Sequence, residues 1–120
     1  MPRMIEKRGV PRVPTDIFVQ EVDGDRRFLH PALNISIDGI SCYMDGSIHI
    51  DRTAQLEFTL PNSNRVSSVR GRVAWVEEHS AVVYGVGFKF LDLDDEDRNI
   101  IREYVDTLLA AGSQSYASIG

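Results

Sequence analysis

Apolar and polar residues alternate along the middle of this chain with a period of two. In one segment Leu56, Phe58 and Leu60 are separated by polar residues, and in another Val73 and Trp75 share one parity. Neighbouring side chains of a β-strand point to opposite faces, so this alternation indicates strands with one buried face. We therefore expect all five of these side chains, Trp75 included, in the core.

A further run of apolar residues on even positions predicts another strand. Its members are Val82, Tyr84, Val86, Phe88 and Phe90. Glycines at 85 and 87 occupy the opposite face, which is typical of close packing against a bulky neighbour. They precede no helix, so we do not interpret them as a dinucleotide-binding loop.

Turn-forming sequences separate these segments. Asp23 and Gly24 stand between two apolar stretches and favour a hairpin turn. Asp45 and Gly46, and the Pro-Asn-Ser-Asn sequence at 61–64, favour further turns. About six antiparallel strands result, and twisted sheets of this size tend to close into a small barrel.

The period changes to that of a helix near Asp94. One apolar stripe is formed by Ile100, Ile101, Tyr104, Val105, Leu108 and Leu109. Asp94 suits the N-cap, and we interpret the acidic residues at 92–97 as helix capping rather than as a calcium loop. Gly112 is expected to end the helix and to leave 112–120 as a loose tail. The expected fold is thus an all-β-dominated, six-stranded antiparallel barrel with one C-terminal helix, spanning 15–111.

Size and charge exclude several classes of protein. The chain has 120 residues, the size of one domain, and a net charge of −5. This charge argues against DNA or RNA binding and against a broad basic membrane-binding face. Neither a signal peptide nor an apolar run long enough for membrane insertion is present. With a single cysteine, Cys42, which we expect to be buried, the sequence favours a cytoplasmic location.

No pattern assembles a catalytic or metal site. His30, His49 and His79 stand singly, without a second ligand at the spacing of a zinc site. No serine has an adjacent candidate base. We therefore expect no catalytic residues, no bound metal and no cofactor, and predict that the protein is not an enzyme.

The first fourteen residues form a polar, basic arm. Pro11 and Pro14 disfavour a helix there. Arg8 and Arg12, preceded by Lys7, carry planar guanidinium groups that can bind phosphate with two hydrogen bonds or stack on a base. Taken alone, these cations are equally consistent with a solvated basic terminus.

A second motif, Asn-Ile-Ser-Ile-Asp-Gly, occupies 34–39. With the two isoleucines inward, Asn34 and Ser36 face outward side by side and can hydrogen-bond the edge of a base. Gly39 then permits a bend or a close approach of the backbone. Taken alone, the motif also fits a strand that ends in an Asp-Gly turn.

In combination the two motifs resemble those of the PilZ domain family, bacterial receptors for the second messenger cyclic di-GMP. The segments 71–76 and 85–88 are similar to the family's last two strands, and the helix at 94–109 resembles its terminal helix. The resemblance implies that Arg8 and Arg12 hold phosphate and the Hoogsteen edge of guanine. It implies that Asn34, where the family often has Asp, bonds a guanine edge with Ser36, and that Gly39 lets the backbone lie close.

The resemblance also implies a mode of action. Lys7 would favour an intercalated pair of ligand molecules over a single one. Ligand binding would order a flexible arm, 1–14, and the changed surface would regulate a protein partner in motility, biofilm formation or exopolysaccharide output.

Two other functions are open at this point. One is a PilZ module that does not bind the nucleotide and acts only by docking on proteins, which the intact motifs argue against. The other is a small barrel that binds nucleic acid through exposed aromatics, which the acidic charge argues against.

Overall fold

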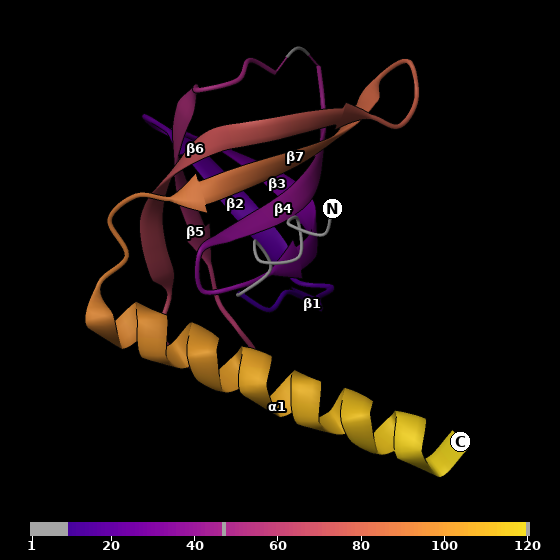
Figure 1. The fold of residues 1–120 in the computed structure, drawn as a ribbon. Coiled ribbons are helices and arrows are strands. Elements are labelled where there is room, and N and C mark those ends of the chain that lie inside the picture. The colour runs from indigo at the N-terminus through magenta and orange to yellow at the C-terminus, as the bar shows by residue number, and fades with distance from the viewer. Residues whose placement is uncertain (1–9, 47, 120) are drawn as a thin grey trace.

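The computed structural model describes residues 10–46 and 48–119, with side chains described as far as Gly112. Seven strands are followed by one helix: β1 (Val13–Pro14), β2 (Phe18–Asp23), β3 (Arg26–Ile35), β4 (Gly39–Asp45), β5 (Thr53–Phe58), β6 (Ser67–Glu78), β7 (Val83–Phe90) and α1 (Asp95–Ile119). The strands wrap around a common core, while α1 lies beneath them and extends past them (Figure 1).

The sheet closes on itself as an antiparallel barrel. Its strands follow the order β1-β3-β2-β5-β6-β7-β4, and an additional pairing of β3 with β4 completes the circle. The expected six-stranded barrel with a C-terminal helix is therefore confirmed. The extra strand, β1, pairs Val13 with Ile35 and Pro14 with Asn34. The expectation of a separate arm over 1–14 is thus wrong for its last two residues, because the Val13 side chain is buried in the core.

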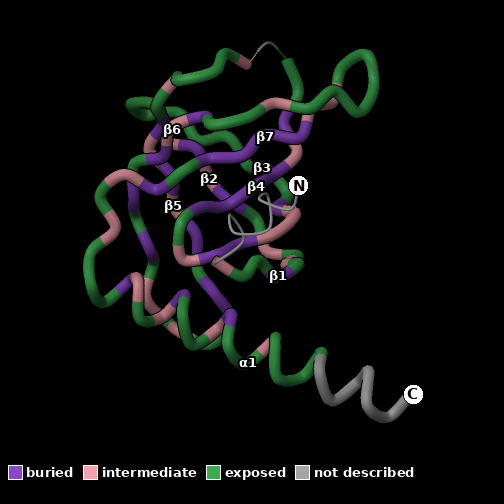
Figure 2. The backbone as a smooth tube through the Cα atoms, in the orientation of Figure 1, coloured by how far each residue is buried: buried purple, intermediate pink, exposed green. Residues whose placement is uncertain are grey.

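The core follows the alternation of the sequence. Buried residues lie mainly along the strands, and most residues of the loops are exposed (Figure 2). Leu56, Phe58, Leu60 and Val73 are buried as expected. Val82 was expected with them but is 63% exposed, because it lies in the hairpin before β7 begins.

A β-bulge reverses the face of Trp75. Val73 pairs with Phe88 and Trp75 with Gly87, so that Ala74 between them has no partner on β7. An extra residue in one strand of a pair moves every following side chain to the other face. Trp75 is therefore 36% exposed on the outside of the barrel, and its expected place in the core is wrong.

The start of α1 is capped and anchored as its acidic residues suggested. Oδ1 of Asp94 accepts a hydrogen bond from the Asp97 N–H at 2.9 Å. Asp97 is 2% exposed, and its Oδ1 accepts from Nε of Arg65 at 2.8 Å and from Oγ of Ser67 at 2.9 Å. These bonds attach the first turn of the helix to the barrel at the beginning of β6.

The end of the helix differs from expectation. Gly112 does not stop it, since α1 continues to Ile119, and the expected loose tail is wrong for residues 112–119. A glycine inside a helix costs about 1 kcal/mol relative to alanine, which weakens a helix without ending it. Within the part of the chain that the structure describes, no helix is long and apolar enough to cross a membrane.

Candidate ligand-binding site

The side chain of Asn34 joins three segments at the edge of the barrel. Its Oδ1 accepts a hydrogen bond from Nη1 of Arg12 at 2.7 Å and one from Oγ of Ser41 on β4, also at 2.7 Å. Because a guanidinium can only donate, this contact assigns Oδ1 to the side facing Arg12. The amide Nδ2 makes no hydrogen bond to any described residue, so it is a donor that a ligand can use.

Ser36 is placed differently from the sequence-based expectation. It lies just beyond the end of β3 and is 1% exposed, so it does not stand beside Asn34 on the outer face. Its Oγ accepts a hydrogen bond from the Asp38 N–H at 3.0 Å, and its own N–H donates to the Gly39 carbonyl at 2.9 Å. A short hydroxyl side chain that bonds the backbone two residues on is typical of tight turns. Ser36 thus shapes the turn between β3 and β4.

Gly39 begins β4 at a point where two backbones nearly touch. It pairs with Lys89 of β7, and a Cβ added at this position would overlap the carbonyl oxygen of Phe88. The absence of a side chain is therefore a requirement of space. The close approach at Gly39 is thus one between β4 and β7, and its expected role toward a ligand stays a prediction.

A shallow pocket of about 200 Å³ adjoins Arg12 and Gly39. It is lined by Arg12, Asp38, Gly39, Ala74, Trp75, Gly87, Phe88 and Lys89. We call it the Trp75 pocket. It combines two cationic side chains with an exposed aromatic ring, a combination suited to a ligand that carries both phosphates and flat bases.

The indole of Trp75 lies directly on Gly87 of the neighbouring strand. A Cβ at Gly87 would overlap the indole nitrogen, and a Cβ at Gly85 would press on the imidazole of His79. The expected role of these glycines, packing against bulky neighbours, is confirmed. The two glycines were also the signal in the sequence that a large ring covers the outer face of β7, although they did not identify Trp75 as that ring.

Not every predicted site residue can be placed. Lys7 and Arg8 lie outside the described residues, so the geometry bears on Arg12, Asn34, Ser36 and Gly39. Arg12 and Asn34 are brought into contact, and Gly39 lies beside Arg12 in the Trp75 pocket. Sequence reasoning missed Trp75 and Lys89.

The remaining reactive groups lie elsewhere. Cys42 is buried in β4, and burial raises the pKa of its thiol to about 12, so the thiol is protonated at neutral pH. The hydrogen bond from His30, followed by the contacts of Arg52, holds the pKa of Glu21 below its ordinary value although burial opposes this. Among the described residues, no three His, Cys, Asp or Glu side chains gather as metal ligands would.

Comparison with known proteins agrees with the fold and the motifs. A family model described as the PilZ domain matches residues 6–107. A search of curated proteins found no matching relative.

Several solved structures share the fold. The Bacillus subtilis inhibitor of motility (MotI/DgrA) superposes with a TM-score of 0.76 at 16% identity, over 87% of this chain and 52% of the other. The PilZ domain of YcgR from Escherichia coli, solved with c-di-GMP, superposes with a TM-score of 0.68 at 9% identity, over 92% of this chain and 98% of the other. The MrkH–c-di-GMP complex of K. pneumonia gives 0.69 at 15% identity, over 90% of this chain and 55% of the other.

These likenesses show the fold, and the chain spans about half the length of the Bacillus and Klebsiella chains. Because the family model covers most of the sequence, and the closed barrel with its C-terminal helix is the fold of these structures, the chain belongs to the PilZ domain family.

Proposed function

We propose that this protein is a cyclic di-GMP receptor whose ligand lies over the Trp75 pocket. The observation that carries the proposal is the hydrogen bond between Arg12 and Asn34, which holds a guanidinium beside an exposed indole. Similar folds of YcgR and MrkH have been solved with the same nucleotide, which supports the proposal.

Each described side chain has a distinct part in this proposal. Arg12 binds phosphate or the Hoogsteen edge of guanine, and its guanidinium is oriented by Asn34. Asn34 donates from Nδ2 to an acceptor on the guanine edge. Trp75 stacks on a base, and Lys89 adds positive charge at the rim of the pocket.

Two residues act through the backbone rather than by contact from a side chain. Gly39 lets the backbones of β4 and β7 approach closely beside the Trp75 pocket, and Ser36 holds the turn that precedes it. From the sequence motif we add Arg8 as the second phosphate ligand. We add Lys7 as the residue that favours a pair of ligand molecules.

We further propose that the ligand-bound form regulates a protein partner. Ordering of the arm against the barrel would change the surface around β1 and the Trp75 pocket. One similar fold belongs to an inhibitor of motility, which supports an output of this kind. A PilZ module that docks on proteins without binding the nucleotide is the other candidate, favoured only if the ligand fails to bind.

Calorimetric titration with cyclic di-GMP tests the proposal, with GTP as the control ligand. Arg12→Ala is expected to abolish binding, and Arg26→Ala, an exposed arginine at the far end of the barrel, is the matched control expected to leave it unchanged. Trp75 is the only tryptophan, so its fluorescence reports directly on stacking in the pocket. A folded wild-type protein that gives neither heat nor a fluorescence change would leave the docking module as the better account.

A further inference from the structure

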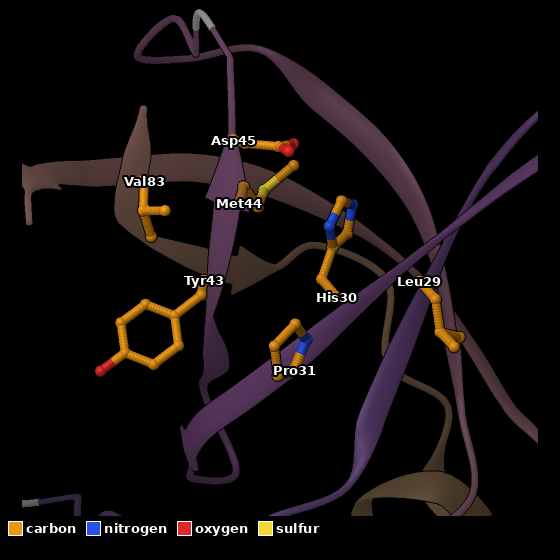
Figure 3. Close-up of a pocket in the computed structure, with 7 residues that line it drawn as sticks. All are labelled: Leu29, His30, Pro31, Tyr43, Met44, Asp45 and Val83. Atoms are coloured by element: carbon orange, nitrogen blue, oxygen red, sulfur yellow. The ribbon is translucent and has the colours of Figure 1, made fainter. Parts of the chain in front are cut away.

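The ladder between β3 and β4 stops before either strand ends. Ile35 pairs with Ile40 and Ala32 with Cys42, but no pair follows. The next residue of β3 is Pro31, which has no N–H to donate to a neighbouring strand. The two strands then diverge, and an opening in the barrel wall lies between them (Figure 3).

The opening is the largest pocket described, with a volume of about 370 Å³. It is lined by Leu29, His30, Pro31, Tyr43, Met44, Asp45 and Val83. All but Val83 are the residues that would have faced one another had the β3–β4 register continued. We call this opening the β3–β4 slit.

Both strands present an unpaired edge to the slit. Residues 26–31 of β3 pair only with β2, on the side away from the slit. Residues 43–45 of β4 pair only with β7. No strand among the described residues pairs with these edges, and an unpaired strand edge is a template for an added strand.

A buried polar group faces the slit. His30 is 9% exposed, and its ring lies between β3 and β4, close to Met44 and Asp45 (Figure 3). Its Nε2 lies 3.1 Å from Oε1 of Glu21, whose other oxygen accepts from Arg52 at 3.0 Å. Because a carboxylate can only accept, Nε2 is the donor in this contact, and Nδ1 makes no hydrogen bond to a described residue.

The rim of the slit is acidic. The alternation of strands places the loops at 23–26, 45–52 and 77–83 at the same end of the barrel, away from α1. These loops carry Asp23, Asp25, Asp45, Asp51, Glu77 and Glu78 against Arg26 and Arg52 only. Exposed apolar side chains also lie at this end of the barrel: Leu29, which lines the slit, and Ile50 and Val82 in the loops.

We propose that the β3–β4 slit binds an extended segment of a partner protein, in which one apolar side chain enters the slit and lysines or arginines on either side of it pair with the acidic rim. Alternate side chains of a strand point in opposite directions, so an apolar residue directed at Met44 leaves its neighbours facing Asp45 and the loops. Nucleic acid is disfavoured as the occupant by the net charge of −5.

The inference deepens the partner-regulating part of the proposed function by assigning a surface to the partner. It does not depend on nucleotide binding, because the slit and the Trp75 pocket share no lining residue. The two sites nonetheless share strands β3 and β4. Asn34, which contacts Arg12, pairs with Ser41, and the next pair along these strands, Ala32 with Cys42, is the last one before the slit.

The test uses the full chain without nucleotide and a blocked peptide of sequence Lys-Thr-Lys-Leu-Lys-Thr-Lys. Peptide is titrated into ¹⁵N-labelled protein, and amide shifts are followed by NMR. Shifts are expected at Tyr43, Asp45 and Val83, with the Trp75 indole unchanged. Two matched peptides, one with Glu for every Lys and one with Ser for Leu, are expected to bind at least about tenfold more weakly.

Reversing a charge on the protein provides a second, independent test. Asp45→Lys is expected to weaken binding of the basic peptide roughly tenfold and to leave cyclic di-GMP binding unchanged. Glu103→Lys, at an exposed carboxylate on α1, is the control expected to leave both unchanged.

The proposal is overturned by an absence of shifts at about 1 mM peptide, by shifts that map away from the slit, or by equal binding of the acidic peptide. Because the peptides are compared on wild-type protein, that comparison tests binding at the slit even if a variant fails to fold. Failure of cyclic di-GMP to bind the wild-type protein would instead remove the receptor proposal and leave the peptide result standing.

Discussion

Nη1 of Arg12 donates a hydrogen bond of 2.7 Å to Oδ1 of Asn34, across a separation of 22 residues in the chain. The contact joins the basic segment before β1 to the end of β3. Neither motif specifies a ligand alone, but here one carboxamide oxygen orients the guanidinium and leaves Nδ2 of the same amide for a ligand.

Replacement of Asn34 separates its two tasks. Asn34→Ala removes the acceptor shared by Arg12 and Ser41 and is expected to weaken cyclic di-GMP binding about tenfold, near 1.4 kcal/mol. Asn34→Asp keeps the acceptor and adds a charge-assisted bond to Arg12 but loses the Nδ2 donor, so binding is expected to lie between that of wild type and that of the Ala variant. Calorimetry measures both, and an Asp variant as weak as the Ala variant would show that orientation of Arg12 is not what matters.

A side chain at Gly39 is expected to break the barrel locally. Gly39→Ala would drive a methyl group into the carbonyl of Phe88, which forces β4 and β7 apart. We expect a loss of about 2 kcal/mol or more in the free energy of unfolding, together with loss of ligand binding. Urea unfolding measures the first effect and calorimetry the second.

Gly112→Ala is the matched control for that variant. A Cβ at Gly112 meets nothing within 4 Å, and the residue lies inside α1. The same change is therefore expected to stabilise the protein by up to about 1 kcal/mol. Equal effects at the two positions would contradict the steric explanation for Gly39.

Trp75 is expected to contribute to binding more than to folding. Because its ring is on the outer face, Trp75→Ala should weaken cyclic di-GMP binding by about 1–3 kcal/mol through lost stacking. Trp75→Phe retains an aromatic face and should recover most of the affinity. If both variants bind as wild type does, the ligand does not occupy the Trp75 pocket.

The buried Glu21 is expected to make stability depend on acidity. Its pKa in the folded protein is lowered from 4.5, chiefly by the hydrogen bond from His30. The resulting stabilisation is complete above the unfolded pKa of 4.5 and is lost as the pH falls through the lower folded value. Glu21→Gln should therefore lower stability at pH 7 by about 1–3 kcal/mol and flatten the loss of stability below about pH 4.5.

Glu57→Gln provides the comparison for Glu21. Glu57 forms an ion pair of 2.7 Å with Arg27 on the outside of the barrel. Exposed pairs of this kind contribute about 0–1 kcal/mol, so this variant should change neither the stability nor its pH dependence appreciably. Urea unfolding of both variants between pH 7 and about pH 3 makes the comparison. An identical pH profile in Glu21→Gln and wild type would contradict the assigned cause.

The sequence by itself determined the elements and most of the barrel. The period-two runs around Leu56 and Phe88 require strands with one buried face, and the stripe through Ile101 and Val105 requires a helix packed on one side. These strands and this helix are predicted from residues that lie close together in the chain, because side-chain periodicity and helix capping are local effects. The sequence also indicated a role for the glycine at position 39, because the Asn-Ile-Ser-Ile-Asp-Gly motif ends there.

Tertiary structure decided which face Trp75 presents, where Ser36 points and where the barrel wall opens. The bulge at Ala74 arises from the register with β7, and the slit arises because Pro31 meets β4 at the point where a donor is required. Register and strand closure depend on partners distant in sequence, and a shift of one residue reverses every side chain that follows. Local sequence patterns do not contain that shift, so the exposed position of Trp75 beside the proposed ligand site is seen only in the folded chain.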